Sequence, residues 1–142
     1  MPESKNNPMG TYRVGLGNVG SYQVSGAPYI TGSTSLVPNA EHCIGFPFVA
    51  KSVLVINTDT AGSDDLRVHF NSTSSAGRVI DGLHYVALNE NKDSITFNTK
   101  CKEIFISAPT GNGGNASYTV VAELTSIQTT SMYALTGSGL TD

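Results

Sequence analysis

The chain has 142 residues, of which 8 are Lys or Arg and 11 are Asp or Glu, and its formal net charge is −3 at pH 7. This length suits one domain around a single core. The lack of any basic run argues against direct nucleic-acid binding, which needs cations opposite the phosphates. No stretch reaches the roughly 20 apolar residues that span a bilayer. Gly, Ser, Thr and Asn make up about 40% of the sequence, which disfavours helices because these residues prefer turns and extended backbone.

Apolar residues recur with a period of two along most of the chain, which predicts β-strands. In chain order, the expected strands cover residues 12–16, 43–49, 53–56, 66–71, 84–88, 94–98, 104–106 and 118–124. The segments 53–56 and 104–106 are apolar on both faces, as central strands are. Pro47 lacks an N–H, so its strand should lie at an edge or carry a bulge there. Short strands between polar turns predict an all-β fold, a single antiparallel β-sandwich that is jelly-roll-like.

The alternation also predicts which side chains fill the core. In residues 118–124, one face carries Tyr118, Val120, Ala122 and Leu124. The residues expected to form most of the core are Val53, Val55, Leu66, Val68, Phe70, Ile95, Phe97, Ile104, Ile106, Val120 and Leu124.

Both ends of the chain differ from the middle. Residues 1–35 and 128–142 are poor in charge, rich in small polar residues, and carry isolated large apolar residues. We expect them to be extended N- and C-terminal arms of a sandwich domain that covers residues 36–127. Such arms bury too little surface alone, so they should become ordered on a neighbour. Large side chains that enter a partner's groove supply much of the binding energy. The partner-binding residues expected in the arms are Tyr22, Tyr29, Ile30, Met132, Tyr133 and Leu135.

One glycine pattern resembles a cofactor motif. Residues 15–20 (GLGNVG) match G-x-G-x-x-G, but the dinucleotide-binding motif needs a helix directly after it to hold the pyrophosphate. Residues 21–28 contain Ser, Gly and Pro and do not predict a helix. The pattern is interpreted as a turn, and no cofactor is expected.

The cysteines and aspartates do not form a recognisable metal site. Cys43 and Cys101 are the only cysteines, and we favour buried free thiols over a disulfide, although the sequence leaves both open. His42 adjoins Cys43, but neighbouring strand residues point to opposite faces, which is poor for chelation. The acidic loop at residues 59–65 lacks the calcium-loop spacing. No metal is expected.

No arrangement of residues predicts catalysis. His69 and His84 lie in strand-like segments, and a serine nucleophile would need an exposing turn such as G-x-S-x-G, which the sequence lacks. Polar residues on the faces of paired strands account for both histidines. No catalytic residue is assigned.

The segments 20–33 (GSYQVSGAPYITGS), 50–57 (AKSVLVIN) and 135–140 (LTGSGL) resemble small virion structural proteins of tailed bacteriophages, most of all those of marine cyanophages. The resemblance implies a protein that coats or cements the phage head, or a small component of the tail. It brings no catalytic residues to this chain.

The expected function is therefore that of a non-enzymatic capsid decoration protein. We expect a homo-oligomer, with a trimer favoured, bound to the major capsid protein or another virion protein, without nucleic acid or membrane. The first ten residues lack the apolar stretch of a secretory signal, so synthesis in the host cytoplasm and a place on the virion surface are expected. The alternative is a small phage tail or receptor- or glycan-binding module, although the absence of Trp disfavours sugar stacking.

Overall fold

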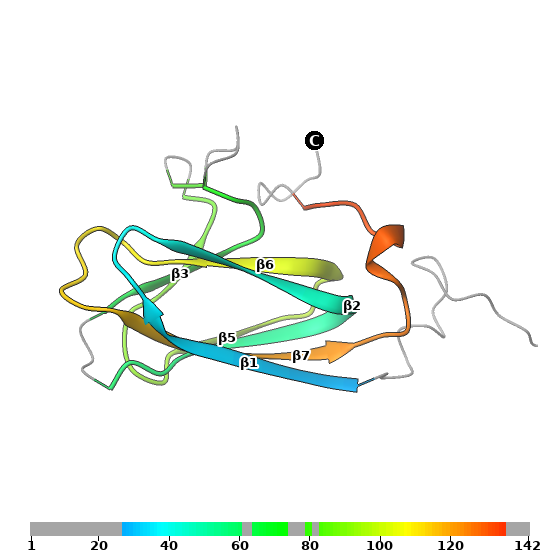
Figure 1. Ribbon diagram of the computed structural model, residues 1–142, viewed down its shortest axis with the longest axis horizontal. Coiled ribbons are helices and arrows are strands. Elements are labelled where there is room, and N and C mark those ends of the chain that lie inside the picture. The colour runs from blue at the N-terminus through cyan, green and yellow to red at the C-terminus, as the bar shows by residue number, and fades with distance from the viewer. Residues whose placement is uncertain (1–26, 61–63, 74–78, 81–82, 136–142) are drawn as a thin grey trace, which may run out of the picture.

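The computed structural model describes residues 27–60, 64–73, 79–80 and 83–135 (Figure 1). These residues form seven strands and one short 3-10 helix, and all strand pairs are antiparallel. The prediction of an all-β, antiparallel fold is thereby confirmed. The elements are β1 Ala27–Leu36, β2 Glu41–Asn57, β3 Leu66–His69, β4 Val86–Leu88, β5 Ser94–Phe97, β6 Cys101–Ser107, β7 Ala116–Leu124 and the 3-10 helix η1 Thr129–Ser131.

The strands form one sheet in the order β1-β7-β2-β6-β3-β4, and β5 pairs with β2 beside this path. The long strand β2 has 17 residues and different neighbours along its length. Its first part, residues 41–45, pairs with β6, and its second part, residues 52–57, pairs with β7. Because β2 runs through both parts, the sheet curls, and Figure 1 shows β6 on one side of the core and β1, β5 and β7 on the other. The predicted central position of residues 53–56 and 104–106 is confirmed.

The change of neighbours along β2 coincides with Pro47. The register between β2 and β6 shifts between Gly45 and Ala50, so the ladder is interrupted around Pro47, in agreement with the expected edge or bulge there. The Val49 N–H donates to the Ile127 carbonyl oxygen at 2.9 Å. The backbone groups of the bend thus have partners in the segment that follows β7.

The core lies between the two parts of the curled sheet. The alternation predicted for residues 118–124 is confirmed, since Tyr118, Val120, Ala122 and Leu124 are all buried. Of the predicted core, Phe70, Ile95 and Phe97 are only half-buried. The predicted residues that are buried are Val53, Val55, Leu66, Val68, Ile104, Ile106, Val120 and Leu124.

Phe70 and Phe97 cover the margin of the core. Their rings meet edge to face, with centroids 5.1 Å apart. Phe97 lies on β5, which pairs with β2 alone among the described strands, so one side of its ring has no neighbouring strand. The two rings therefore pack against the core rather than within it, which corrects their place in the predicted core.

The described parts of the two expected arms pack on the sheet. β1 pairs with β7 from Ala27 to Leu36, so residues 27–35 of the expected N-terminal arm are part of a sheet strand. A Cβ at Gly32 would lie 2.6 Å from the Tyr118 carbonyl oxygen, and glycine therefore permits this close approach. At the other end, Met132 is buried with Val49 and Ile127. The expected strand at 12–16 and the glycine pattern at 15–20 lie outside the described residues, and the division into arms and domain stays a prediction.

Truncation of Ile104 tests the core against a matched isoleucine. Ile104 is fully buried on β6 and Ile56 is half-buried on β2. Ile104→Ala should lower the free energy of unfolding by roughly 2–5 kcal/mol because it leaves a cavity. Ile56→Ala should cost less than half as much, because water can fill the space. Urea unfolding of both variants measures this difference, and equal losses would contradict the assignment of inner and outer faces.

Candidate functional site

Ser107 lies at the centre of a polar row on the sheet. Its strand partners are Glu41 on β2 and Arg67 on β3, and directly paired residues of antiparallel strands project to the same face. All three line a pocket of about 210 Å³. The lining residues are Asn39, Ala40, Glu41, Arg67, Thr73, Ile80, Ser107, Ala108, Pro109 and Thr110.

His69 lies in the adjacent row on the same face of β3, paired with Phe105. It is buried, and both of its ring nitrogens have hydrogen-bond partners. Nδ1 lies 2.7 Å from the Asn71 carbonyl oxygen, and Nε2 lies 2.8 Å from the Ser107 Oγ. Because a carbonyl oxygen only accepts, Nδ1 carries the hydrogen of the neutral ring, and Nε2 accepts from the Ser107 hydroxyl. The ring stacks on Phe105 with centroids 6.1 Å apart. Burial lowers the pKa of His69, which favours this neutral form.

A neutral imidazole that accepts from a serine is the pairing that activates nucleophiles. The same pairing also satisfies two buried polar groups with one another, as folded proteins require. Ser107 is only 6% exposed, so its oxygen has little access to a substrate. We therefore interpret the contact between Ser107 and His69 as structural.

Glu41 and Arg67 give the pocket charges of both signs. Glu41 Oε1 accepts from the Thr73 N–H at 2.8 Å and from its hydroxyl at 2.6 Å. Burial alone would raise the pKa of Glu41, but these hydrogen bonds hold it below its usual value. The guanidinium of Arg67 lies 4.7 Å from the centroid of the Tyr85 ring. A polar ligand with an anionic group would fit these neighbours.

The acidic loop is organised by hydrogen bonds from backbone amides. The Asp64 N–H donates to Asp59 Oδ2, and the Gly114 N–H donates to Asp64 Oδ1, both at 3.1 Å. Asn57 donates through Nδ2 to the Leu88 carbonyl oxygen at 2.8 Å. These bonds tie the loop after β2 to the loop between β6 and β7. In the described part of the chain, no group of three or more His, Cys, Asp or Glu side chains could hold a metal ion.

Cys43 and Cys101 are both free thiols. Burial raises the pKa of Cys101 to about 12, so this residue is an inert part of the core, as predicted. Cys43 is exposed, and its thiol lies 3.7 Å from Glu103 Oε1. The expectation of two buried thiols is therefore wrong for Cys43, which lies on the outward face of β2.

A second candidate site is the free edge of β1. β1 is 10 residues long and carries no charged residue. Among the described strands it pairs with β7 alone. Natural sheets usually protect such edges with charges, prolines, bulges or very short strands, because unpaired backbone groups invite another strand. In β1, Pro28 lies near the start and the register shifts only after Ser33, so the stretch between them is regular.

An apolar row runs inward from this edge on the outer face of the sheet. Ile30 is the strand partner of Val121, and Val121 is the partner of Leu54. Ile30 is 68% exposed, while the other two side chains are half-buried. No described strand covers this row, which is therefore accessible to a partner.

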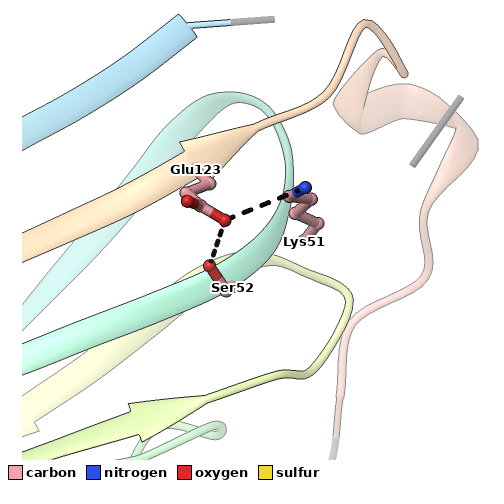
Figure 2. A network of polar contacts seen from close by, with 3 residues as sticks. All are labelled: Lys51, Ser52 and Glu123. Atoms are coloured by element: carbon pink, nitrogen blue, oxygen red, sulfur yellow. Dashed lines mark hydrogen bonds and ion pairs between the residues drawn. The ribbon is translucent and has the colours of Figure 1, made fainter. Parts of the chain in front are cut away.

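Polar side chains border the apolar row. Pro28, Glu123 and Ser52 form the adjacent row on the same face. Figure 2 shows the Glu123 carboxylate between Ser52 and Lys51: Ser52 Oγ donates to Oε1 at 2.9 Å, and Lys51 Nζ lies 3.9 Å from the same oxygen. Such exposed contacts add little stability, but they place the Lys51 ammonium group beside the negative charge of Glu123.

The predicted partner-binding residues have different environments. Ile30 and Tyr133, at 68% and 58% exposure, present free surface. Tyr29 faces inward and meets the Phe46 ring edge to face at 5.6 Å. Met132 is buried and Leu135 packs against the core, both within this chain, and Tyr22 lies outside the described residues. Their role in partner binding stays a prediction.

Neither the β1 edge, which no described strand pairs with, nor the pocket around Ser107 was predicted from the sequence. The signal for the edge was present, since residues 27–36 combine extended-backbone residues with a complete lack of charge. The pocket had no local signal, because its residues come from strands far apart in the chain.

Comparison with protein-family models, with curated proteins and with solved structures finds no match for this chain. Within the part of the chain that the structure describes, no helix is long and apolar enough to cross a membrane.

Buried His69 predicts a loss of stability in acid. Its folded-state pKa lies below that of the unfolded chain, near 6.5, so protons bind the unfolded state more readily. The stability from neutral His69 is present above that value and is lost as pH falls through the folded-state pKa. Between about pH 7.5 and 5, the melting temperature of the wild type should fall more than that of His69→Gln. Ser107→Ala keeps the buried imidazole, so its melting temperature should fall between these two pH values by as much as that of the wild type. Parallel pH dependence of His69→Gln and wild type would exclude this role.

Proposed function

We propose that this protein is a non-enzymatic structural component of a virion, a decoration or cement protein that stabilises a phage head. The observation that carries the proposal is the free, uncharged edge of β1 with exposed Ile30 beside it. An edge of this kind is costly for a protein that remains alone, because it promotes aggregation. Such an edge is useful in a protein that assembles with other chains. The virion proteins of tailed bacteriophages, which this sequence resembles, are proteins of that class.

The proposed body is a jelly-roll-like sandwich, with the two parts of the curled sheet as its layers. Such a rigid body would present one edge in a fixed geometry, and many copies would bind a shell through weak contacts that reinforce one another. The low share of charged residues, 13%, suits extensive contact with neighbours because few charges must lose their hydration. The partners proposed are further copies of the chain and the major capsid protein or another virion protein.

Localisation in purified particles tests this proposal directly. The chain is expected in virions at a copy number comparable to that of the major capsid protein, and added protein should co-sediment with undecorated shells. Mild treatment that removes it should lower the temperature at which heads lose their DNA. Absence of the chain from purified virions would refute the proposal, and a few copies at the tail would favour the alternative below.

The pocket around Ser107 supports a second candidate, a tail or receptor- and glycan-binding module. Arg67 and Glu41 would bind the charged and hydroxyl groups of an acidic sugar, and the pocket volume of about 210 Å³ suits a single sugar unit. On a glycan array, the full chain should then bind acidic glycans, and Arg67→Gln should lose this binding. A matched Lys100→Gln variant should bind as the wild type does. Lack of binding to every glycan would remove this candidate.

A further inference from the structure

We propose that two copies of this chain pair through β1, antiparallel and about a two-fold axis, so that one sheet continues into the other. This inference rests on the proposed assembling function and names the first partner in it. In the proposed register, Ile30 lies directly opposite Ile30 of the second copy.

The lengths of the free edges favour β1 paired with itself. The other strands at the ends of the described sheet are β4 with 3 residues and β5 with 4 residues. The first part of β2 pairs with β6 alone over residues 41–45 and carries Glu41. None of these edges matches the 10 residues of β1. A two-fold antiparallel contact uses the same surface on both copies, so β1 meets β1. With Ile30 at the two-fold axis, residues 27–33 of the two strands overlap.

Charge also permits this contact. β1 contains no Asp, Glu, Lys or Arg, so two β1 strands bring no like charges together. The nearest charge on the outer face is Glu123, opposite Pro28, and Lys51 and Ser52 already contact its carboxylate (Figure 2). In the register proposed, Pro28 lies beside Gly32 of the second copy, which has no side chain to obstruct it.

The apolar row gives the contact a hydrophobic component. In each copy the row runs from Leu54 through Val121 to Ile30, where it ends at the free edge. Pairing at Ile30 joins two rows into one that crosses six strands. The most exposed side chain of the row, Ile30 at 68%, then packs against its equivalent, and cross-strand apolar pairs of this kind stabilise sheets.

Sedimentation of the full chain tests the inference. The wild type should show a concentration-dependent mass of twice 14.9 kDa. Ile30→Lys places two ammonium groups face to face and removes two apolar side chains, so the dimer dissociation constant should rise roughly 100-fold. The matched control is Leu83→Lys, which makes the same change at a side chain that is 71% exposed in a turn, and it should leave the constant unchanged. Circular dichroism establishes that both variants are folded.

Hydrogen exchange on the wild type gives a second readout that needs no variant. The β1 amides between Pro28 and Ser33, which the proposed register pairs, should exchange faster on dilution, while those of β6 should not change. If β1 were protected in a monomer, independently of concentration, another part of the same chain would cover the edge, and the inference would be overturned.

A trimeric mass, or equal effects of the two lysine variants, would also overturn it. A monomer that is nevertheless abundant in virions would refute the pairing and leave the proposed function intact. A β1 dimer absent from virions would refute the function alone.

Discussion

The continuity of β2 is the constraint on which the rest of the structure depends. A strand of 17 residues that changes its neighbours midway forces the sheet to curl, because its first part follows β6 and its second part follows β7. The change occurs where Pro47 cannot donate a ladder hydrogen bond. The Val49 carbonyl oxygen accepts from both the Thr125 N–H, at 2.9 Å, and the Thr125 hydroxyl, at 2.7 Å. The segment after β7 thus fixes the bend, and the buried Ile127 and Met132 close the core behind it.

The ends of the described sheet differ in the length of their edge strands. Where the sheet ends at β4 and β5, the strands are short and lead directly into turns. Where it ends at β1, a strand of 10 residues pairs with β7 along one side. Tyr29 packs inward against Phe46 of β2, and Gly32 permits the close approach to Tyr118. No described strand pairs with the other side of β1. The pairing with β7 is regular from Ala27 to Ser33, and the register shifts only between Ser33 and Leu36.

The polar pocket follows from the same sheet order. Glu41, Ser107 and Arg67 are brought into one row only because β6 lies between β2 and β3. Charges of opposite sign then stand two strands apart, with the Ser107 hydroxyl directed to His69 between them. In this arrangement Glu41 accepts hydrogen bonds from Thr73, and the guanidinium of Arg67 lies over the Tyr85 ring.

The sequence by itself determined the all-β class, the central strands and most of the core, because a period of two reports directly which face of a strand meets the interior. It also indicated an interrupted ladder at Pro47, because proline has no N–H to donate. Phe70 and Phe97 show the limit of this signal: alternation gives the direction of a side chain, whereas its burial depends on whether a further strand lies beside it. Only the tertiary structure decided that residues 27–36 join β7, that His69 meets Ser107 across the sheet, and that the β1 edge has no described neighbour. These features depend on which distant segments pair, and strand pairing is set by the whole core rather than by the residues of any one strand.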